Sequence, residues 1–225
     1  MKIIMINSFP PGLIMFLGAF LIPIFPHIYR QFYMFLLVIM SAISLFSSQG
    51  THLIIELNNI NFILHHSDNL SFPFAIVFHI AAFLIIIYGS HVKDWKEQLS
   101  IISYSGAAIA ALHAGDLFTL FLWWEATAFT SVILIFNGKT TRAYKSAIRY
   151  IIIQVGSGVL LLSGAVLLFQ SKNEVLFQEL DINSAAGLLI FIAFGIKAAF
   201  PFLNGWLQDS YPEASEVGTV ALSAF

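Results

Sequence analysis

Two charged side chains fall within long apolar stretches of this sequence. Glu125 lies in FLWWEA at 121–126, with no basic residue within one helical turn of it, and Lys197 lies in FGIKAAFP at 194–201. A charge at the centre of a membrane helix costs roughly 2.5–3.5 kcal/mol on insertion scales, so such residues usually pair and mark ion pathways. The chemistry that these two residues could perform is therefore proton transfer within a membrane.

Glu125 and Lys197 are expected to form a pair, because either charge alone would be expensive to bury. Burial and mutual attraction act in opposite senses on each group, so small changes nearby alter its protonation. Pro201 removes a backbone hydrogen bond four residues after Lys197 and is expected to distort the helix there. Broken helices at mid-membrane are tolerated where they line a hydrated cavity. We interpret the region as an ion path, with a purely structural ion pair as the alternative.

Three further residues are candidates for a proton relay. Asp116 follows Gly115 at an expected turn between two spans, where capping a helix start would explain it equally well. His79 and His113 lie inside or near the ends of apolar spans. A histidine hydrogen-bonded between helices explains either of them as well as a relay does.

The composition places these residues in a membrane protein. Of the 225 residues, 59% are hydrophobic and 10% are charged, against roughly 25% charged in soluble domains. The net charge of −2 and the lack of a basic cluster argue against a nucleic-acid partner. Cysteine is absent and the histidines show no metal-binding spacing, so we expect no metal site. Nucleotide-binding and nucleophile motifs are also missing, so we expect no cofactor and no enzyme activity of the chain by itself.

Apolar stretches of about 20 residues set the expected architecture, since a bilayer core of ~30 Å requires that length. The runs are continuous rather than alternating, which argues against strands. Small residues at 156–158 and 163–164 would allow close helix packing. The chain is expected to be one all-α membrane domain, 1–225, a polytopic helix bundle. Its seven expected spans are about 9–28, 31–48, 71–90, 98–114, 116–136, 148–169 and 185–204, with a partial eighth at 217–225.

The distribution of basic residues predicts the orientation. Basic residues gather after the first, third and fifth expected spans, and the loop 49–70 has none. Loops rich in Lys and Arg face the cytoplasm, so the N-terminus is expected outside. The residues on the expected cytoplasmic side are Arg30, Lys93, Lys96, Lys139, Arg142, Lys145 and Arg149, against Lys2 and Lys172 on the other.

Three motifs resemble one known family. They are DNLS at 68–71, GDLFTLFLWWE at 115–125, and GIKAAFPF at 195–202 followed by WLQDSYPEA at 206–214. Together they resemble the antiporter-like membrane subunits of respiratory complex I, a proton-pumping NADH:quinone oxidoreductase, and the D-type subunit of Mrp-type multisubunit sodium/proton antiporters. The resemblance covers most of the chain and implies the first inverted repeat of the antiporter-like fold.

The resemblance also implies a function. Glu125 occupies the family's glutamate of the fifth span and Lys197 its lysine of the seventh, the pair associated with proton transfer. The chain would then be a proton-translocating or monovalent cation/proton antiporter subunit in the inner membrane, with protons and sodium as candidate ions. Other membrane subunits of the assembly would be its partners.

Two departures from the family pattern matter. Asn204 stands where the family commonly has histidine, and the family continues beyond SAF, here 223–225, into a span with a central lysine and a second repeat. The 225 residues thus correspond to the N-terminal half of such a subunit. Two alternatives stay open: a non-conducting scaffold fragment, and a membrane subunit of a complex I-type quinone oxidoreductase. A seven-helix receptor has no ligand motif to support it.

Overall fold

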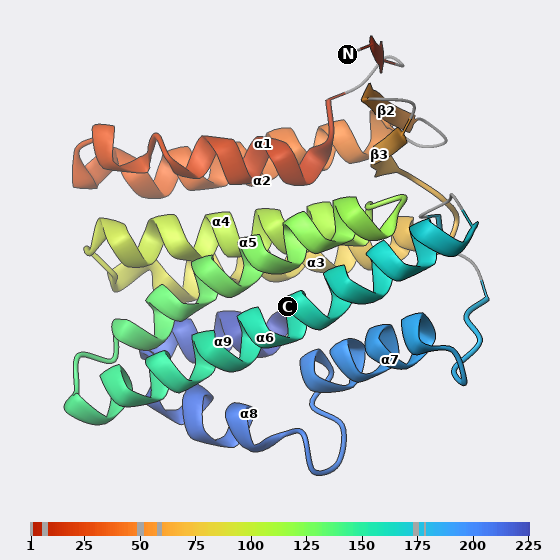
Figure 1. Ribbon diagram of the computed structural model, residues 1–225. Helices are drawn as coiled ribbons and strands as arrows, with labels where there is room; N and C mark the ends of the chain where they lie inside the picture. Colours follow the sequence, from red (N-terminus) through yellow and green to blue (C-terminus); the bar gives the residue numbers. More distant parts are fainter. Residues whose placement is uncertain (1, 6–8, 49–51, 58–59, 173–175, 178) are drawn as a thin grey trace.

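Helices dominate the computed structural model, which describes residues 2–5, 9–48, 52–57, 60–172, 176–177 and 179–225. Most of them run side by side, with α1 and α2 along one edge, α3 to α5 in the middle, and α6 and α7 along the other edge (Figure 1). The helices are α1 Pro11–Ala19, α2 His27–Ser47, α3 Ser71–Tyr88, α4 Trp95–Leu112, α5 Leu117–Phe136, α6 Thr141–Lys172, α7 Ala185–Lys197, α8 Gly205–Ser210 and α9 Glu216–Ala224. Short 3-10 turns lie at η1 Ile22–Ile24, η2 Gly89–His91 and η3 Tyr211–Glu213.

Among the described residues, four segments are long and apolar enough to cross a membrane: His27–Ser47, Ser71–His91, Leu117–Phe136 and Thr141–Ser171. Ala185–Lys197 is a shorter apolar helix. The first expected span, 9–28, is divided into α1 and η1, where Pro23 stands. The structure therefore agrees with a helical membrane protein of several spans, and a count of seven is not established by helix length and composition.

A small sheet corrects the expectation of a chain without strands. It comprises β1 Lys2–Met5, β2 His52–Leu57 and β3 Ile60–His66, antiparallel in the order β1-β2-β3. The expected loop 49–70 supplies β2 and β3, although 49–51 and 58–59 lie outside the described residues. Such strands of four to seven residues are much shorter than the ~10-residue alternating stretches that mark a membrane strand. Short β-branched runs such as HLIIEL still favour an ordinary hairpin.

Helix α4 lies at the centre of the bundle and packs very closely against α1. A Cβ on Gly106 of α4 would lie 2.6 Å from Phe16 N and 2.9 Å from Gly12 O, both backbone atoms of α1. Such close approach is typical of small-residue helix contacts in membranes. Three serines of α4 donate to the carbonyl four residues earlier, which satisfies their hydroxyls within the buried helix.

Helix α7 ends at Lys197, seven residues before the expected end of its span. Ala199 and Phe202 have φ values of 53° and 71°, so the chain leaves the helix in a left-handed turn around Pro201. Trp206 of α8 donates its Nε1–H to Ile196 O at 2.9 Å, which satisfies a carbonyl at the helix end. The distortion expected at Pro201 is thus a complete break, and the break places Lys197 at a helix terminus.

Candidate ion-translocation site

The side chain of Lys197 crosses from α7 to one turn of α5. Its Nζ donates to Thr127 Oγ1 at 3.1 Å and to Trp124 O at 3.4 Å. The same atom lies 5.1 Å from the centroid of the Trp124 ring, within the range of a cation–π interaction. The ammonium is half-buried and is held by the turn of α5 that carries the other candidate charge.

Glu125 follows Trp124 on α5 and faces α6. Its Oε1 is buried and has no hydrogen-bond partner among the described residues, and it lies directly against Gly158. Glu125 lies in the same turn of α5 as Trp124 and Thr127, the two residues that Lys197 contacts. Glu125 and Lys197 are not among the ion pairs within 4.0 Å that the described residues form. The two charges are therefore neighbours separated by a gap rather than a closed salt bridge.

Trp124 connects these charges to α6. Its Nε1–H donates to Ser157 Oγ at 3.0 Å, and Ser157 in turn donates to Gln154 O at 2.7 Å. The indole is buried, so this bond fixes the ring against which Lys197 lies. Neither Trp124 nor Thr127 was among the candidate residues predicted from the sequence. Trp124 and Thr127 are three residues apart, which is one turn of a helix near Glu125, and this spacing could have identified them as neighbours of the pair.

Asp116 is fully buried and caps the start of α5. It accepts hydrogen bonds from Thr119 N at 2.8 Å and Thr119 Oγ1 at 2.6 Å. A third bond comes from Ile63 N of β3 at 2.6 Å, so the same carboxylate attaches the sheet to the helix. The capping explanation accounts for this geometry, and a relay role for Asp116 stays a prediction.

His79 and His113 are buried and share one pattern. The Nδ1 of each lies beside the carbonyl four residues earlier, at 2.7 Å for Ala75 O and 2.8 Å for Ile109 O. His79 also contacts Ser41 Oγ at 2.7 Å and so joins α3 to α2, whereas the His113 ring stacks on His65. Neither histidine has a described hydrogen bond or ion pair to Glu125 or Lys197. The structure thus brings the central pair together, and none of the hydrogen bonds or ion pairs among the described residues joins the three other candidates to it.

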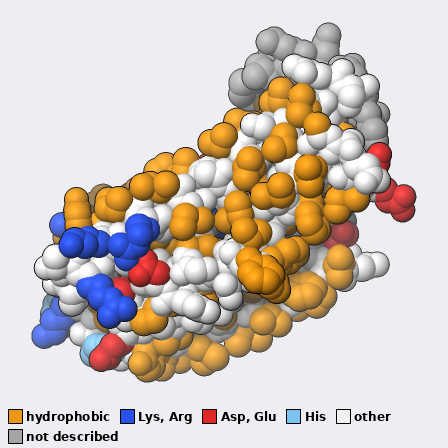
Figure 2. All heavy atoms as spheres, turned by 60° about the horizontal axis from the view of Figure 1, so that its bottom comes forward, with side chains coloured by type: hydrophobic (Ala, Val, Ile, Leu, Met, Phe, Trp, Pro, Cys, Tyr) orange, Lys and Arg blue, Asp and Glu red, His pale blue; other side chains and the backbone are white. Residues whose placement is uncertain are grey.

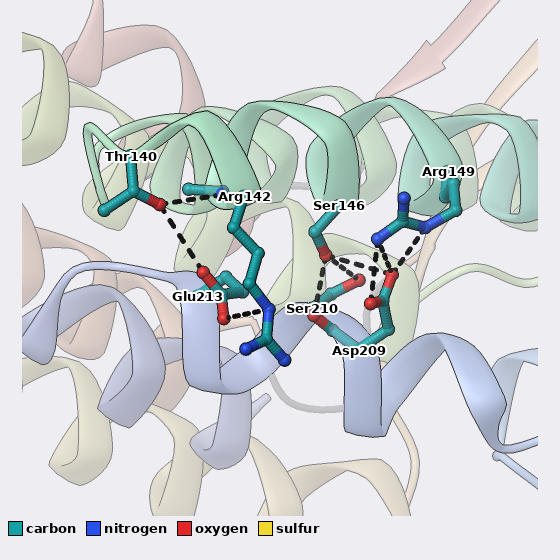
Figure 3. Close-up of polar contacts among 8 residues, drawn as sticks. Thr140, Arg142, Ser146, Arg149, Asp209, Ser210 and Glu213 are labelled. Carbon is teal, nitrogen blue, oxygen red and sulfur yellow. Dashed lines mark hydrogen bonds and ion pairs between the residues drawn. The ribbon is translucent and has the colours of Figure 1, made fainter.

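A polar cluster holds α8 and η3 against α6 (Figure 3). Arg149 makes two bonds to the Asp209 carboxylate, at 2.7 and 2.8 Å, and Ser146 donates to Asp209 O at 2.7 Å. Arg142 Nε lies 2.9 Å from Glu213 Oε1. Bidentate arginine–carboxylate pairs are geometrically specific, so the cluster fixes the short helix whose Trp206 closes the end of α7. The motif at 206–214 therefore contacts both α6 and the end of α7 that carries Lys197.

Several of the basic residues share one end of the molecule. Arg30 Nη1 donates to Lys93 O at 3.3 Å and Lys139 Nζ lies 3.3 Å from Asp94 Oδ2, which brings the starts of α2, α4 and α6 together. Figure 2 shows Lys and Arg gathered at one end of the visible face and hydrophobic side chains over much of the remainder. Glu125 and Lys197 lie away from this basic end, within the apolar helices α5 and α7. Fold and site together define the class: a helical membrane protein with buried charges next to a broken helix.

Comparison with known sequences places the chain within this class. Residues 114–225 match the family described as NADH:quinone oxidoreductase/Mrp antiporter, TM. The Na(+)/H(+) antiporter subunit A1 of Staphylococcus haemolyticus is 27% identical over 174 residues, which are 70% of this chain and 22% of the relative. Its counterpart in Staphylococcus saprophyticus is 29% identical over 160 residues, 63% and 20% of the two chains. The chain thus spans about a fifth of the length of these curated relatives.

Solved structures show the same fold. A chain of the archaeal membrane-bound sulfane sulfur reductase superposes with a TM-score of 0.77 at 21% identity, covering 96% of this chain and 49% of that one. A chain of the Mrp complex from Dietzia sp. DQ12-45-1b gives 0.77 at 18%, with 94% and 26% covered. Respiratory complex I from Thermus thermophilus gives 0.71 at 16%, with 95% and 52% covered.

Over residues 114–225 the chain matches the antiporter-like family of membrane subunits that complex I and the Mrp antiporters share, and the Mrp subunit A1 relatives and the complex I and Mrp structures support the same family. The family resemblance seen in the three motifs is therefore confirmed. The two curated Mrp relatives described above are subunit A1, whereas the motifs suggested the D-type subunit as the Mrp counterpart.

Proposed function

We propose that this chain forms part of a proton-translocating or monovalent cation/proton antiporter subunit, and that Glu125 and Lys197 are its proton-transfer pair. One observation carries the proposal. The break in α7 sets the Lys197 ammonium against the turn of α5 that contains Glu125. The nearby carboxylate keeps a buried oxygen without a described hydrogen-bond partner. Such an oxygen is available to a proton, a water molecule or a cation.

The geometry suggests how the two groups influence each other. Lys197 has acceptors in Trp124 O and Thr127 Oγ1, so it stays in place when its attraction to Glu125 changes. Protonation of Glu125 removes the negative charge that helps to retain the Lys197 proton, which makes release of that proton easier. Because such coupling is reciprocal, loss of the Lys197 proton also favours protonation of Glu125. In such a pair, a change in the protonation of one group alters the protonation of the other, so the two groups can transfer protons in turn.

The names of the relatives support an assembly as the setting. They are an Na(+)/H(+) antiporter subunit, an Mrp complex and a respiratory complex. We therefore propose other membrane subunits as partners and the inner membrane as the location, with the N-terminus outside. A seven-span unit forming the first of two inverted repeats is part of the same proposal. The scaffold alternative also has an observation in its favour, since the hydrogen bonds of Lys197 would suit a structural link between α5 and α7.

Neutralising either charge distinguishes these two functions. Proton flux would be measured in vesicles containing the assembled parent complex, with assembly checked by quantifying the co-purified subunits. Glu125→Gln and Lys197→Ala should each lower the flux at least about tenfold, because a positioned proton-transfer group contributes that much or more. Glu56→Gln, a matched change in β2, should leave the flux unchanged. Wild-type flux in both assembled variants would contradict the proton-transfer role of the pair and support the scaffold function.

A further inference from the structure

Two of the small residues of α6, Ser157 and Gly158, face the candidate pair, whereas Gly156 is exposed. Trp124 donates to Ser157, and Glu125 Oε1 lies against Gly158, the next residue. The α6 backbone thus borders both consecutive side chains of α5. Glycine at 158 leaves the space that the carboxylate occupies.

A side chain at position 158 would collide with Glu125 and with no backbone. A Cβ built there would overlap the Glu125 Oε1, lie 2.8 Å from its Cδ and stand 3.5 Å from Phe121 Cε2. All three are side-chain atoms, and the first two belong to the end of a flexible side chain. At Gly156, two residues earlier on the same helix, a Cβ would meet nothing within 4 Å. The helices can therefore keep their separation if Gly158 becomes alanine, but the carboxylate must move.

Helix-packing glycines elsewhere in the chain show the contrast. At Gly106 an added Cβ would meet backbone atoms of α1, Phe16 N and Gly12 O, so that glycine sets the distance between two helices. At Gly158 the constraint falls on one carboxyl group instead. A packing role does not explain why the first atom met is the buried oxygen of the only Glu in α5.

We propose that Gly158 is a positioning residue for proton transfer. Because Gly158 has no side chain, it leaves a space beside α6, here called the seat, in which the Glu125 carboxylate is held. This inference rests on the proposed function of Glu125. The seat fixes how far the carboxylate stands from Lys197, which approaches from α7. Displacement of a reacting group by about 1 Å can cost about a hundredfold in rate, so a methyl group in the seat lowers transfer without unfolding the bundle.

The test compares Gly158→Ala with Gly156→Ala in the assembled parent complex. Both changes favour the helix by a similar amount, so they differ mainly in what the new methyl group meets. Gly158→Ala should lower proton flux at least about tenfold and shift the pH at which the flux is half-maximal. Gly156→Ala should match the wild type in both measurements. Wild-type proton flux and wild-type pH dependence in both variants would overturn the inference.

A rescue variant separates positioning from general damage. Aspartate is shorter than glutamate by one methylene, so Glu125→Asp withdraws the carboxylate from the methyl group at position 158. The double variant Gly158→Ala/Glu125→Asp should therefore carry more flux than Gly158→Ala alone. A double variant that falls below both singles would contradict a steric seat.

A cross-linking measurement reports the geometry independently of transport. The chain has no cysteine, so Glu125→Cys/Gly158→Cys would introduce one pair in adjacent positions, and oxidation should join them in a disulfide. Glu125→Cys/Gly156→Cys should not cross-link. If the cross-link forms but Glu125→Gln keeps full flux, the proposed function fails and the positioning role fails with it. If Glu125→Gln lowers the flux but Gly158→Ala does not, the positioning role alone is wrong.

Discussion

At the scale of single residues, charged side chains within apolar stretches allowed candidate site residues to be predicted from the sequence. Glu125 and Lys197 could be selected from the sequence because each is costly at membrane depth. Thr127 and Gly158 could not, because a hydroxyl and a glycine are common in membrane helices and carry no charge. Their roles depend on which helix faces which, and a single sequence does not specify that. Asp116 was open between two roles: its bonds from Thr119 fit a helix cap and its bond from Ile63 N attaches β3, while a relay role stays a prediction.

Asp68 offers a residue-scale prediction about pH. Its Oδ1 accepts from Ser71 N at 2.6 Å and from Leu70 N at 3.0 Å, and these bonds at the start of α3 lower its pKa. A lowered pKa in the folded state means stabilisation that is fully present above the ordinary Asp value and is lost as pH falls through the lowered value. Amide exchange at Ser71 should therefore be slow at neutral pH, relative to intrinsic rates, and lose protection in acid.

The matched control is Asp68→Asn, which keeps the size of the side chain and removes its titration. Hydrogen exchange followed by mass spectrometry should show little change in the protection of Ser71 with pH in this variant. Equal pH dependence in the wild type and in Asp68→Asn would mean that another group controls the turn.

At the scale of helices, most of the expected spans correspond to observed helices, and the differences have physical causes. The last expected span was extended to 204 because apolar residues continue past Lys197, but Pro201 and the left-handed Ala199 and Phe202 stop the helix. Hydropathy depends only on amino-acid composition, so it does not detect where a helix ends within an apolar stretch. The hairpin of β2 and β3 was missed for the related reason that short strands outside a membrane lack a long periodic signal.

Gly106→Ala tests the contact between α1 and α4. The new Cβ would lie 2.6 Å from Phe16 N and 2.9 Å from Met15 Cβ, so the two helices must separate. Overpacking of this kind typically costs about 1–3 kcal/mol. Thermal unfolding in detergent should show a lower midpoint for Gly106→Ala than for Gly156→Ala, where the added methyl group meets open space. Identical midpoints would show that α1 does not pack on α4 in this way.

At the scale of the whole molecule, the family and the membrane class could both be predicted from the sequence. The family motifs at 115–125 and 195–214 fall on α5 and on the end of α7 with α8 and η3, and Lys197 at the end of α7 reaches α5. The transported ion and the partner subunits are not encoded in any local pattern of these residues. They depend on surfaces and paths shared with other chains.

The orientation can be tested with single cysteines, since the chain has none of its own. Lys139 is exposed at the turn before α6 and Asn183 is exposed before α7, beyond the opposite end of α6. Positive loops face the cytoplasm. A membrane-impermeant thiol reagent added to intact cells should therefore label Asn183→Cys, and Lys139→Cys only after permeabilisation. The reverse labelling would invert the proposed topology.

The central claim is that Glu125 and Lys197 act as one unit in proton transfer. A double-mutant cycle in the assembled parent complex tests it most directly, with proton flux measured for the wild type, Glu125→Gln, Lys197→Ala and the double variant. Groups that act as a unit are non-additive, so the double variant should carry no less flux than the worse single variant. Losses that multiply, with the double variant reduced by the product of the two single effects, would contradict the account.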